Sequence, residues 1–342
     1  MMDLVEATGT RYMALTEELP TFLSQALLQC KNLPAMPSTA LKVLMLARTP
    51  RATLGDYART IECDPALTLR LVTLANSAYY RRASQATGCL DAVQQLGLDT
   101  TLVAVLSFSL LPPSADHYRQ RAWQRSITAA LIAQRLAERY CADARGNVYT
   151  AALLQDIGIL ALQAAYPDKA ATLYGDAELA HHQIEQLEQT LFNGDHALVG
   201  AWLAAKWGAP DALVDAIRAS HAEIEPSEPA QLCLRLSGPL ADTLLAPNPA
   251  AMLARLLPTL ERLALCPPLS LKDLFEHVQH QLKALSEALT LPAASTLDTQ
   301  ALLAEAQELL FEHTLEMERR QERRERKSAA RLHRFMPHEA GR

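Results

Sequence analysis

The stretch DPALTLRLVTLANSAYY, residues 64–80, carries the clearest structural signal in the sequence. Asp64 is a favourable N-cap, and Pro65 suits the first position of a helix. Apolar side chains then recur on one helical face, at Leu67, Leu71, Leu74 and Ala75. The pattern predicts a helix from Pro65 to about residue 78.

Most of the remaining chain repeats this helical pattern. Thr53 and Asp56 approximate a capping box upstream, whereas Gly97 is placed to end one helix and Asp99 to begin another. Clusters of β-branched residues with a period of two do not occur. We therefore expect an all-α protein with short helices through residues 20–111, then helices near 117–140, 147–164, 178–192, 196–207, 211–220, 228–245, 250–265, 270–289 and 299–327.

Prolines mark the expected boundaries between helical blocks. Pro112 and Pro113 resist continuation of a helix, and Pro247 and Pro249 interrupt the chain again. The sequence thus predicts an N-terminal segment (1–19), an N-terminal lobe (20–112), a second lobe (113–246) and a C-terminal helical region with a charged terminal helix and a disordered end (247–342).

Composition limits the function classes. The 342 residues are 49% hydrophobic and 20% charged, which excludes whole-chain disorder. The net charge of −6 gives no basic surplus, so we expect no nucleic-acid partner. The six cysteines form no CxxC pair, which argues against a zinc knuckle or a dithiol redox motif. Because the N-terminus lacks a basic-apolar signal and the longest apolar run, 102–111, is about half a membrane span, we expect a cytoplasmic protein.

The C-terminal end is electrostatically distinct. Residues 316–342 hold nine Arg/Lys and five Glu, a local charge of +4. An apolar stripe precedes them, formed by Leu302, Leu303, Ala306, Leu309, Leu310 and Met317. We expect this helix to pack for four or five turns and then to enter solvent, fraying after about residue 327. Contact of the basic end with acidic protein, a membrane surface or RNA is the alternative.

Six motifs carry a family resemblance. They are LPAMP (33–37), the stretch 64–80, LDAVQQLGLD (90–99), AALLQDIG (151–158), FNGDHALVGAWLAAKWGAP (192–210) and AIRASH (216–221). Over about residues 20–245 the chain resembles the HDOD family, bacterial signalling domains related to the HD superfamily of metal-dependent phosphohydrolases. The resemblance implies a fold of two helical lobes and a role in regulating motility, virulence or cyclic-dinucleotide signalling.

Resemblance to the HD superfamily also implies a metal site. The defining His-Asp pair is here Gln155-Asp156, and a neutral amide is a poor replacement for imidazole. An earlier histidine of the superfamily aligns with Arg125, which cannot coordinate a cation. The resemblance therefore implies a degenerate HD site, and we expect no cofactor, no bound metal and no enzymatic activity.

Other positions of the HD site are retained, and three interpretations of them stay open. In the first, these side chains only cap or pair internally. In the second, the Arg125 guanidinium takes the space of the lost metal and pairs with Asp156. In the third, a metal is retained. The degenerate site, a candidate ligand pocket, comprises Arg125, Gln155, Asp156, His196, His221 and Asp242.

A second candidate surface lies at the end of the quoted stretch. Asn76, Ser77 and Tyr80 form a candidate partner surface, because Asn and Ser are poor residues in helix interiors and are often kept for their hydrogen bonds. Alternatively they only end the helix and anchor the loop that follows.

Two further pairs receive structural interpretations. Trp202 and Trp207 are expected to pack in the core or between helices. His181 and His182 are adjacent, so on a helix their side chains point about 100° apart and rarely bind one ion. We expect both histidines on a solvated surface.

These observations favour a non-enzymatic signalling module. It would recognise a signalling protein or a small ligand at the groove between its lobes, and its C-terminal helices would mediate partner contact or self-association. One rival is a metal-dependent phosphohydrolase with an atypical site. The other is a nucleic-acid or membrane adaptor that acts through the basic end of the chain.

Overall fold

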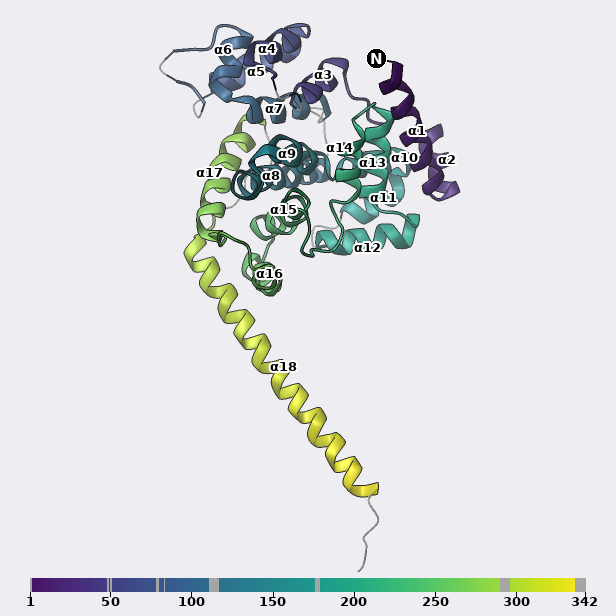
Figure 1. Ribbon diagram of the computed structural model, residues 1–342, viewed down its shortest axis with the longest axis vertical. Coiled ribbons are helices and arrows are strands. Elements are labelled where there is room, and N and C mark those ends of the chain that lie inside the picture. Colours follow the sequence, from purple (N-terminus) through teal and green to yellow (C-terminus); the bar gives the residue numbers. More distant parts are fainter. Residues whose placement is uncertain are drawn as a thin grey trace, which may run out of the picture.

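The computed structural model describes residues 2–47, 49, 51–77, 80–82, 84–110, 117–175, 179–289 and 296–335 (Figure 1). These residues contain helices and no β-strand, which confirms the all-α prediction. The helices are α1 (Met2–Glu18), α2 (Thr21–Gln29), α3 (Ser38–Leu46), α4 (Leu54–Glu62), α5 (Pro65–Ala75), α6 (Cys89–Leu96), α7 (Leu98–Leu110), α8 (His117–Tyr140), α9 (Arg145–Leu154), α10 (Ile157–Ala165), α11 (Pro167–Gly175), α12 (His181–Phe192), α13 (His196–Lys206), α14 (Asp211–Arg218), α15 (Pro229–Leu245), α16 (Pro249–Leu263), α17 (Leu271–Leu289) and α18 (Thr299–Phe335).

The predicted helix starts of the first lobe are confirmed. Thr53 and Asp56 form a reciprocal capping box, in which the Thr53 amide donates to Asp56 Oδ2 over 2.7 Å. Asp64 accepts hydrogen bonds from the Ala66 and Leu67 amides at the start of α5. Local capping chemistry therefore fixes this part of the fold. Helix α5 is shorter than predicted: it ends at Ala75, whereas the sequence pattern placed its end near residue 78.

Figure 1 shows three groups of helices. Helices α3 to α7 gather at one end of the molecule, and α8 lies at the centre against α9 and α15. Helices α10 to α14 form the opposite side, together with α1 and α2. The second and third groups meet at the turn between α9 and α10, where the candidate site lies.

The second lobe contains two α-helices more than predicted. The expected helix 147–164 is two helices, α9 and α10, separated at Gln155 and Asp156. Asp156 has φ −102° and ψ 8°, outside the helical region, so its backbone turns and its buried carboxylate reaches Arg125 on α8. The sequence prediction also missed α11 and began α12 at residue 178 instead of His181.

A close approach of α10 and α13 sets the position of the site. Gly158 and Gly200 lie at this crossing, and a Cβ atom on Gly158 would lie 2.0 Å from the His196 carbonyl oxygen. Only glycine at position 158 permits this distance. The crossing brings the start of α10, beside Asp156, next to the start of α13 at His196.

The first helices pack on the second lobe. Trp202 of α13 is fully buried and donates from Nε1 to Thr16 of α1, while Trp207 donates to the Pro34 carbonyl. Both tryptophans therefore have the packing role that the sequence predicted. In the same region, Tyr166 donates to the Phe22 carbonyl of α2.

The C-terminal helices continue the central layer and then leave it. Helix α16 packs on α15, α17 packs on α8, and the first turns of α18 pack on α16 and α17. Leu302 and Ala306 are buried, but Met317 is 50% exposed, so its predicted packing was wrong. The reason is that α18 projects away from the other helices (Figure 1). It continues to Phe335, beyond the predicted fraying near residue 327. The predicted break at Pro112-Pro113 and the end at 336–342 lie outside the described residues.

One stretch among the described residues, 142–165, is long and apolar enough by composition to cross a membrane. Of its most apolar window, 78% is buried inside the protein. It also breaks at Gln155 and Asp156 into two helices. Its place in the core accounts for its apolar composition.

The α10–α13 crossing gives a first testable prediction. Gly158→Ala should destabilise the protein by ~3 kcal/mol, at the upper end for overpacking, because its new methyl group meets backbone rather than a flexible side chain. Urea unfolding of the two proteins measures this difference. Gly175→Ala is the control, since a Cβ atom at position 175 would have no other atom within 4 Å. Equal midpoints for wild type and Gly158→Ala would contradict the assigned packing.

Candidate metal centre

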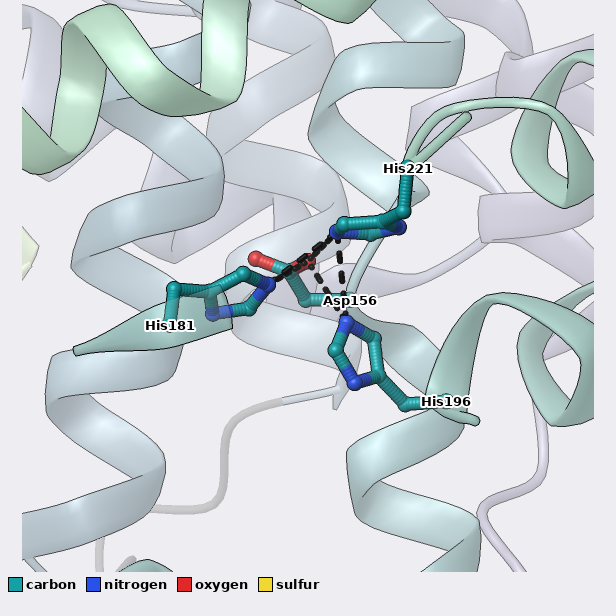
Figure 2. A group of neighbouring side chains, drawn as sticks. All are labelled: Asp156, His181, His196 and His221. Atoms are coloured by element: carbon teal, nitrogen blue, oxygen red, sulfur yellow. Dashed lines mark hydrogen bonds and ion pairs between the residues drawn. The ribbon is translucent and has the colours of Figure 1, made fainter. Parts of the chain in front are cut away.

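Four side chains from four separate segments converge on one point. They are Asp156 before α10, His181 at the start of α12, His196 at the start of α13 and His221 after α14 (Figure 2). One ligand atom from each lies within 4.8 Å of every other. We call this group the His3Asp cluster.

The distances within the cluster are those of a metal coordination shell. Asp156 Oδ1 lies 3.7, 3.5 and 3.4 Å from the Nε2 atoms of His181, His196 and His221. The His221 Nε2 atom lies 3.1 Å from that of His181 and 3.3 Å from that of His196. Ligands bound ~2.0–2.1 Å from a tetrahedral zinc ion lie ~3.3–3.4 Å apart. The cluster therefore has nearly the spacing that one such ion requires.

Hydrogen bonding fixes the tautomer of His196. Its Nδ1 atom lies 2.6 Å from Glu188 Oε2, which is a carboxylate oxygen and must accept. The other oxygen, Glu188 Oε1, accepts from the buried Tyr174 hydroxyl over 2.7 Å. Nδ1 of His196 therefore carries a proton, and the Nε2 lone pair of the neutral ring faces the cluster. A carboxylate behind a histidine in this way is the usual support of a metal ligand.

A hydrogen bond with Ser220 fixes the tautomer of His221, which also carries its proton on Nδ1. The Ser220 hydroxyl donates its single proton to the Ile217 carbonyl over 2.7 Å. Its contact of 2.9 Å with His221 Nδ1 must then be a hydrogen bond donated by the ring. The Nε2 lone pairs of His196 and His221 thus face each other across 3.3 Å, which is repulsive unless a cation or a proton lies between them.

Asp156 supplies a negative charge with one free oxygen. Burial would raise the pKa of this carboxyl, but the Arg125 charge and the neighbouring histidines together hold the pKa well below its usual value. Among the described residues, no donor forms a hydrogen bond with the buried Oδ1 atom. A buried, ionised oxygen without a donor is costly unless a cation is present.

The pKa values of two histidines of the cluster shift in opposite directions. Burial, together with the nearby Arg125 charge, lowers the pKa of His181 well below its usual value, so this ring is neutral at pH 7. Burial would also lower the pKa of His196, but the Glu188 and Asp156 carboxylates together raise it well above its usual value. A raised pKa means that a proton competes with a metal ion for the Nε2 atom of His196. Binding an ion at Nε2 would release that proton.

Arg125 lies beside the cluster and not within it. Its Nη1 atom donates to Asp156 Oδ2 over 2.6 Å, and its Nε and Nη2 atoms donate to Asp242 over 2.7 and 3.1 Å. Gly238 makes room for the guanidinium, because a Cβ there would lie 2.8 Å from Nη2. The predicted Arg125–Asp156 pair is thus present. It uses the Asp156 oxygen that faces away from the histidines, so the donor set still fits a metal ion.

The sequence predicted part of this site. Asp156, His196 and His221 come together as the resemblance implied, whereas Asp242 pairs with Arg125 instead of joining them. Gln155 is buried beside the site, and its Nε2 atom has no partner among the described residues.

The solvated-surface prediction was right for His182, which is exposed, and wrong for His181, which is buried. Their 100° separation sends one side chain inward and the other outward. A signal for His181 was present, because His181, Ile184 and Glu188 follow the spacing of a buried helical face.

The second candidate surface has a structural role. The Asn76 side chain pairs with both backbone groups of Ala86, accepting from its amide over 2.9 Å and donating to its carbonyl over 2.8 Å. Gln95 donates to the Tyr80 carbonyl over 2.9 Å. Asn76 and Tyr80 thus anchor the chain after α5, away from the His3Asp cluster. Ser77 lies beside them, half-buried. A partner contact of these residues stays a prediction.

A pocket of about 300 Å³ opens beside the cluster. His181, His221 and Glu185 are among the residues that line it, and so are Arg235 and Arg255. A small molecule in this pocket would therefore meet both imidazole and guanidinium groups. We call it the cluster pocket.

Comparison with protein families identifies the domain. A family model described as the HDOD domain matches residues 33–223, which is more than half of the chain. The chain belongs to the HDOD family. The His3Asp cluster lies at the C-terminal part of this HDOD domain, since all four residues precede residue 223.

Three comparisons illustrate the relationship. An HDOD domain protein of unknown function from Geobacter sulfurreducens has 26% identity and a TM-score of 0.52, with 89% of this chain and 96% of that one covered. A candidate phosphohydrolase from Shewanella amazonensis SB2B has 25% identity and a TM-score of 0.57, with 77% and 98% covered. A candidate signal transduction protein from Marinobacter aquaeolei VT8 has 23% identity and a TM-score of 0.61, with 82% and 66% covered, and shows the fold alone.

A curated relative gives less information. An uncharacterized protein from Treponema pallidum (strain Nichols) is 25% identical over 196 residues. The alignment covers 56% of this chain and 38% of that protein, so this chain spans well under half of its relative.

The buried Arg125 network gives a second prediction. Arg125→Ala should destabilise the protein by ~3–5 kcal/mol, because Asp156 and Asp242 would keep buried charges without a partner. The free energy of unfolding, from urea titration at pH 7, tests this. Arg135→Ala serves as control, since the Arg135–Glu138 pair is solvent-exposed and its loss should change stability by less than ~0.5 kcal/mol. Similar effects of both variants would mean that Arg125 is not a buried bridge.

Proposed function

We propose that this HDOD protein is a signal-transduction module that holds one transition-metal ion in its His3Asp cluster. The observation that carries this proposal is the convergence of three imidazole Nε2 atoms on the buried Asp156 Oδ1 atom, which lacks a hydrogen-bond donor among the described residues. Such an ion would join four segments that are far apart in the sequence. It would also present a Lewis acid to the cluster pocket.

The donor types indicate the class of metal. Three imidazoles and one carboxylate suit zinc, cobalt, nickel, copper or iron, whereas magnesium and calcium prefer a shell of oxygen atoms. The supporting contacts of His196 and His221 already orient two of the three rings. We therefore expect selection of a late transition metal over magnesium.

The ion pairs of Arg125 with Asp156 and Asp242 favour a role in recognition over a role in catalysis. Many phosphodiester-cleaving enzymes use two metal ions ~3.5–4 Å apart, usually sharing a carboxylate. Here the second Asp156 oxygen and both Asp242 oxygens bind the Arg125 guanidinium, so a permanent positive charge stands where a second ion would need ligands. We propose a non-catalytic cytoplasmic module in which a signalling protein or small ligand is recognised at the cluster pocket.

The terminal helix supports partner contact or self-association. Phe311 is 63% exposed and Met317 is 50% exposed on α18, after this helix has left α16 and α17. Exposed apolar side chains on a projecting helix favour contact with another chain. We propose that α18 transmits the state of the domain to such a partner.

A metal-dependent phosphohydrolase is the second candidate function. The cluster pocket favours it, because His181 and His221 face the pocket together with Arg235 and Arg255, which suit an anionic substrate. Similarity to the Shewanella candidate phosphohydrolase agrees with it. In this case Gln155→His should raise the activity, since it restores an imidazole at the position where the HD superfamily has one.

Metal analysis gives the third prediction. After incubation with zinc and removal of excess metal, the wild-type protein should retain one zinc ion per chain by inductively coupled plasma mass spectrometry. His196→Ala should lose it, with affinity reduced ~100-fold or more, because both a ligand and its link to Glu188 disappear. His182→Ala should retain it, since His182 is exposed and adjacent to a ligand. Wild-type protein without retained metal would refute the proposed function.

Turnover assays separate the two candidate functions. The zinc-, cobalt- and manganese-loaded proteins should not hydrolyse linear or cyclic phosphodiesters above the rate of His196→Ala. This follows from the occupation of Asp242 by Arg125. Hydrolysis by the wild type that His196→Ala abolishes would instead establish the phosphohydrolase.

A further inference from the structure

Glu185 faces the His3Asp cluster from the side of the cluster pocket. It lies one helical turn after His181 on α12, so both side chains project from the same face. Glu185 Oε1 is 3.4 Å from His181 Nε2 and 3.7 Å from His221 Nε2. Its side chain is 27% exposed and lines the pocket.

These distances place Glu185 close to the ligand shell. The Asp156 Oδ1 atom lies 3.7 and 3.4 Å from the same two nitrogens. Two carboxylate oxygens therefore approach the His181–His221 pair at equal range. Glu185 Oε1 stands outside the four atoms that lie within 4.8 Å of one another, so its side chain would have to rotate to bind an ion held by them.

The two carboxylates differ in how they are held. Asp156 is buried, and Arg125 binds its second oxygen. Glu185 is partly exposed and, among the described residues, forms no ion pair with an arginine or a lysine. Asp156 is thus fixed, whereas Glu185 is free to leave the cluster and turn into the pocket.

We infer that Glu185 is a fifth, exchangeable metal ligand that closes the His3Asp cluster on the pocket side, and that a small anion entering the pocket takes its place. This inference rests on the proposed function, because it requires a bound ion. Arg235 and Arg255 line the same pocket as Glu185, and their charges favour an anion there. Exchange of one carboxylate for one anion leaves the net charge around the ion unchanged.

Cobalt provides a spectroscopic test with the full-length protein. Co²⁺ bound to the cluster absorbs visible light, and its spectrum changes when a ligand is exchanged. Azide serves as the anionic probe. For the wild type, azide must displace Glu185, so its apparent affinity is reduced by that competition.

Glu185→Ala and Glu185→Gln should each weaken Co²⁺ binding ~10-fold and tighten azide binding to the Co²⁺ protein ~10-fold. The glutamine variant keeps the packing of α12, so a folding defect is separated from loss of the ligand. Glu223→Gln is the matched control, because it removes the same charge from the pocket lining without touching the cluster. It should shift neither affinity.

The outcomes distinguish failure of the proposed function from failure of the role of Glu185. A wild-type protein that binds no Co²⁺ contradicts the proposed function itself. A protein that binds Co²⁺ equally well with and without Glu185, with unchanged azide affinity, overturns only the role of Glu185. Equal tightening of azide by Glu223→Gln and Glu185→Gln also overturns it, because pocket charge alone would then explain the effect.

Discussion

The contact between Arg125 and Asp156 is the constraint on which the site depends. It helps to keep a fully buried carboxylate ionised, since the guanidinium, together with the histidines around Asp156, holds the pKa of this carboxyl low against the effect of burial. It also orients that carboxylate: one oxygen binds Arg125, and the other points at the three imidazoles. Through its second partner, Asp242, the same guanidinium ties α8 and the α9–α10 turn to α15. An arginine that at first indicates a lost metal site thus holds an anionic oxygen toward three imidazoles.

The fold supplies the remaining ligands by bringing helix ends together. The close α10–α13 crossing at Gly158 places His196 beside Asp156. Helix α12 contributes His181 toward the cluster and Glu188 behind His196, so one buried face serves both the ligands and their support. The His3Asp cluster differs from the ligand set implied by the HD superfamily. His181 is part of the cluster, whereas Asp242 forms an ion pair with Arg125 instead. One ion with imidazole ligands, next to a fixed guanidinium, is the basis we propose for a signalling role in a family related to phosphohydrolases.

The sequence predicted features that depend on local chemistry. Capping at Thr53 and Asp64, the all-α class and the family followed from neighbouring residues or from short motifs. The sequence-based prediction failed where contacts between distant parts of the chain determine the structure. The break at Asp156 arises because Arg125 holds its carboxylate inside the core, and no pattern within 147–164 shows that. His181 was missed because two adjacent histidines were judged as a pair, although the spacing from His181 to Glu188 marks a buried face. The Arg125–Asp242 contact joins residues far apart in the chain, beyond the reach of periodicity.

X-ray absorption spectroscopy at the zinc edge tests the central claim most directly. If the His3Asp cluster is the site, the zinc-loaded protein will show a shell of nitrogen and oxygen atoms at ~2.0–2.1 Å, with the outer-shell scattering of three imidazole rings. The scattering of one ring will disappear in any His181→Ala protein that still retains metal. A spectrum with oxygen neighbours only, or with no imidazole contribution, would contradict the account, because zinc would then be bound elsewhere on the protein.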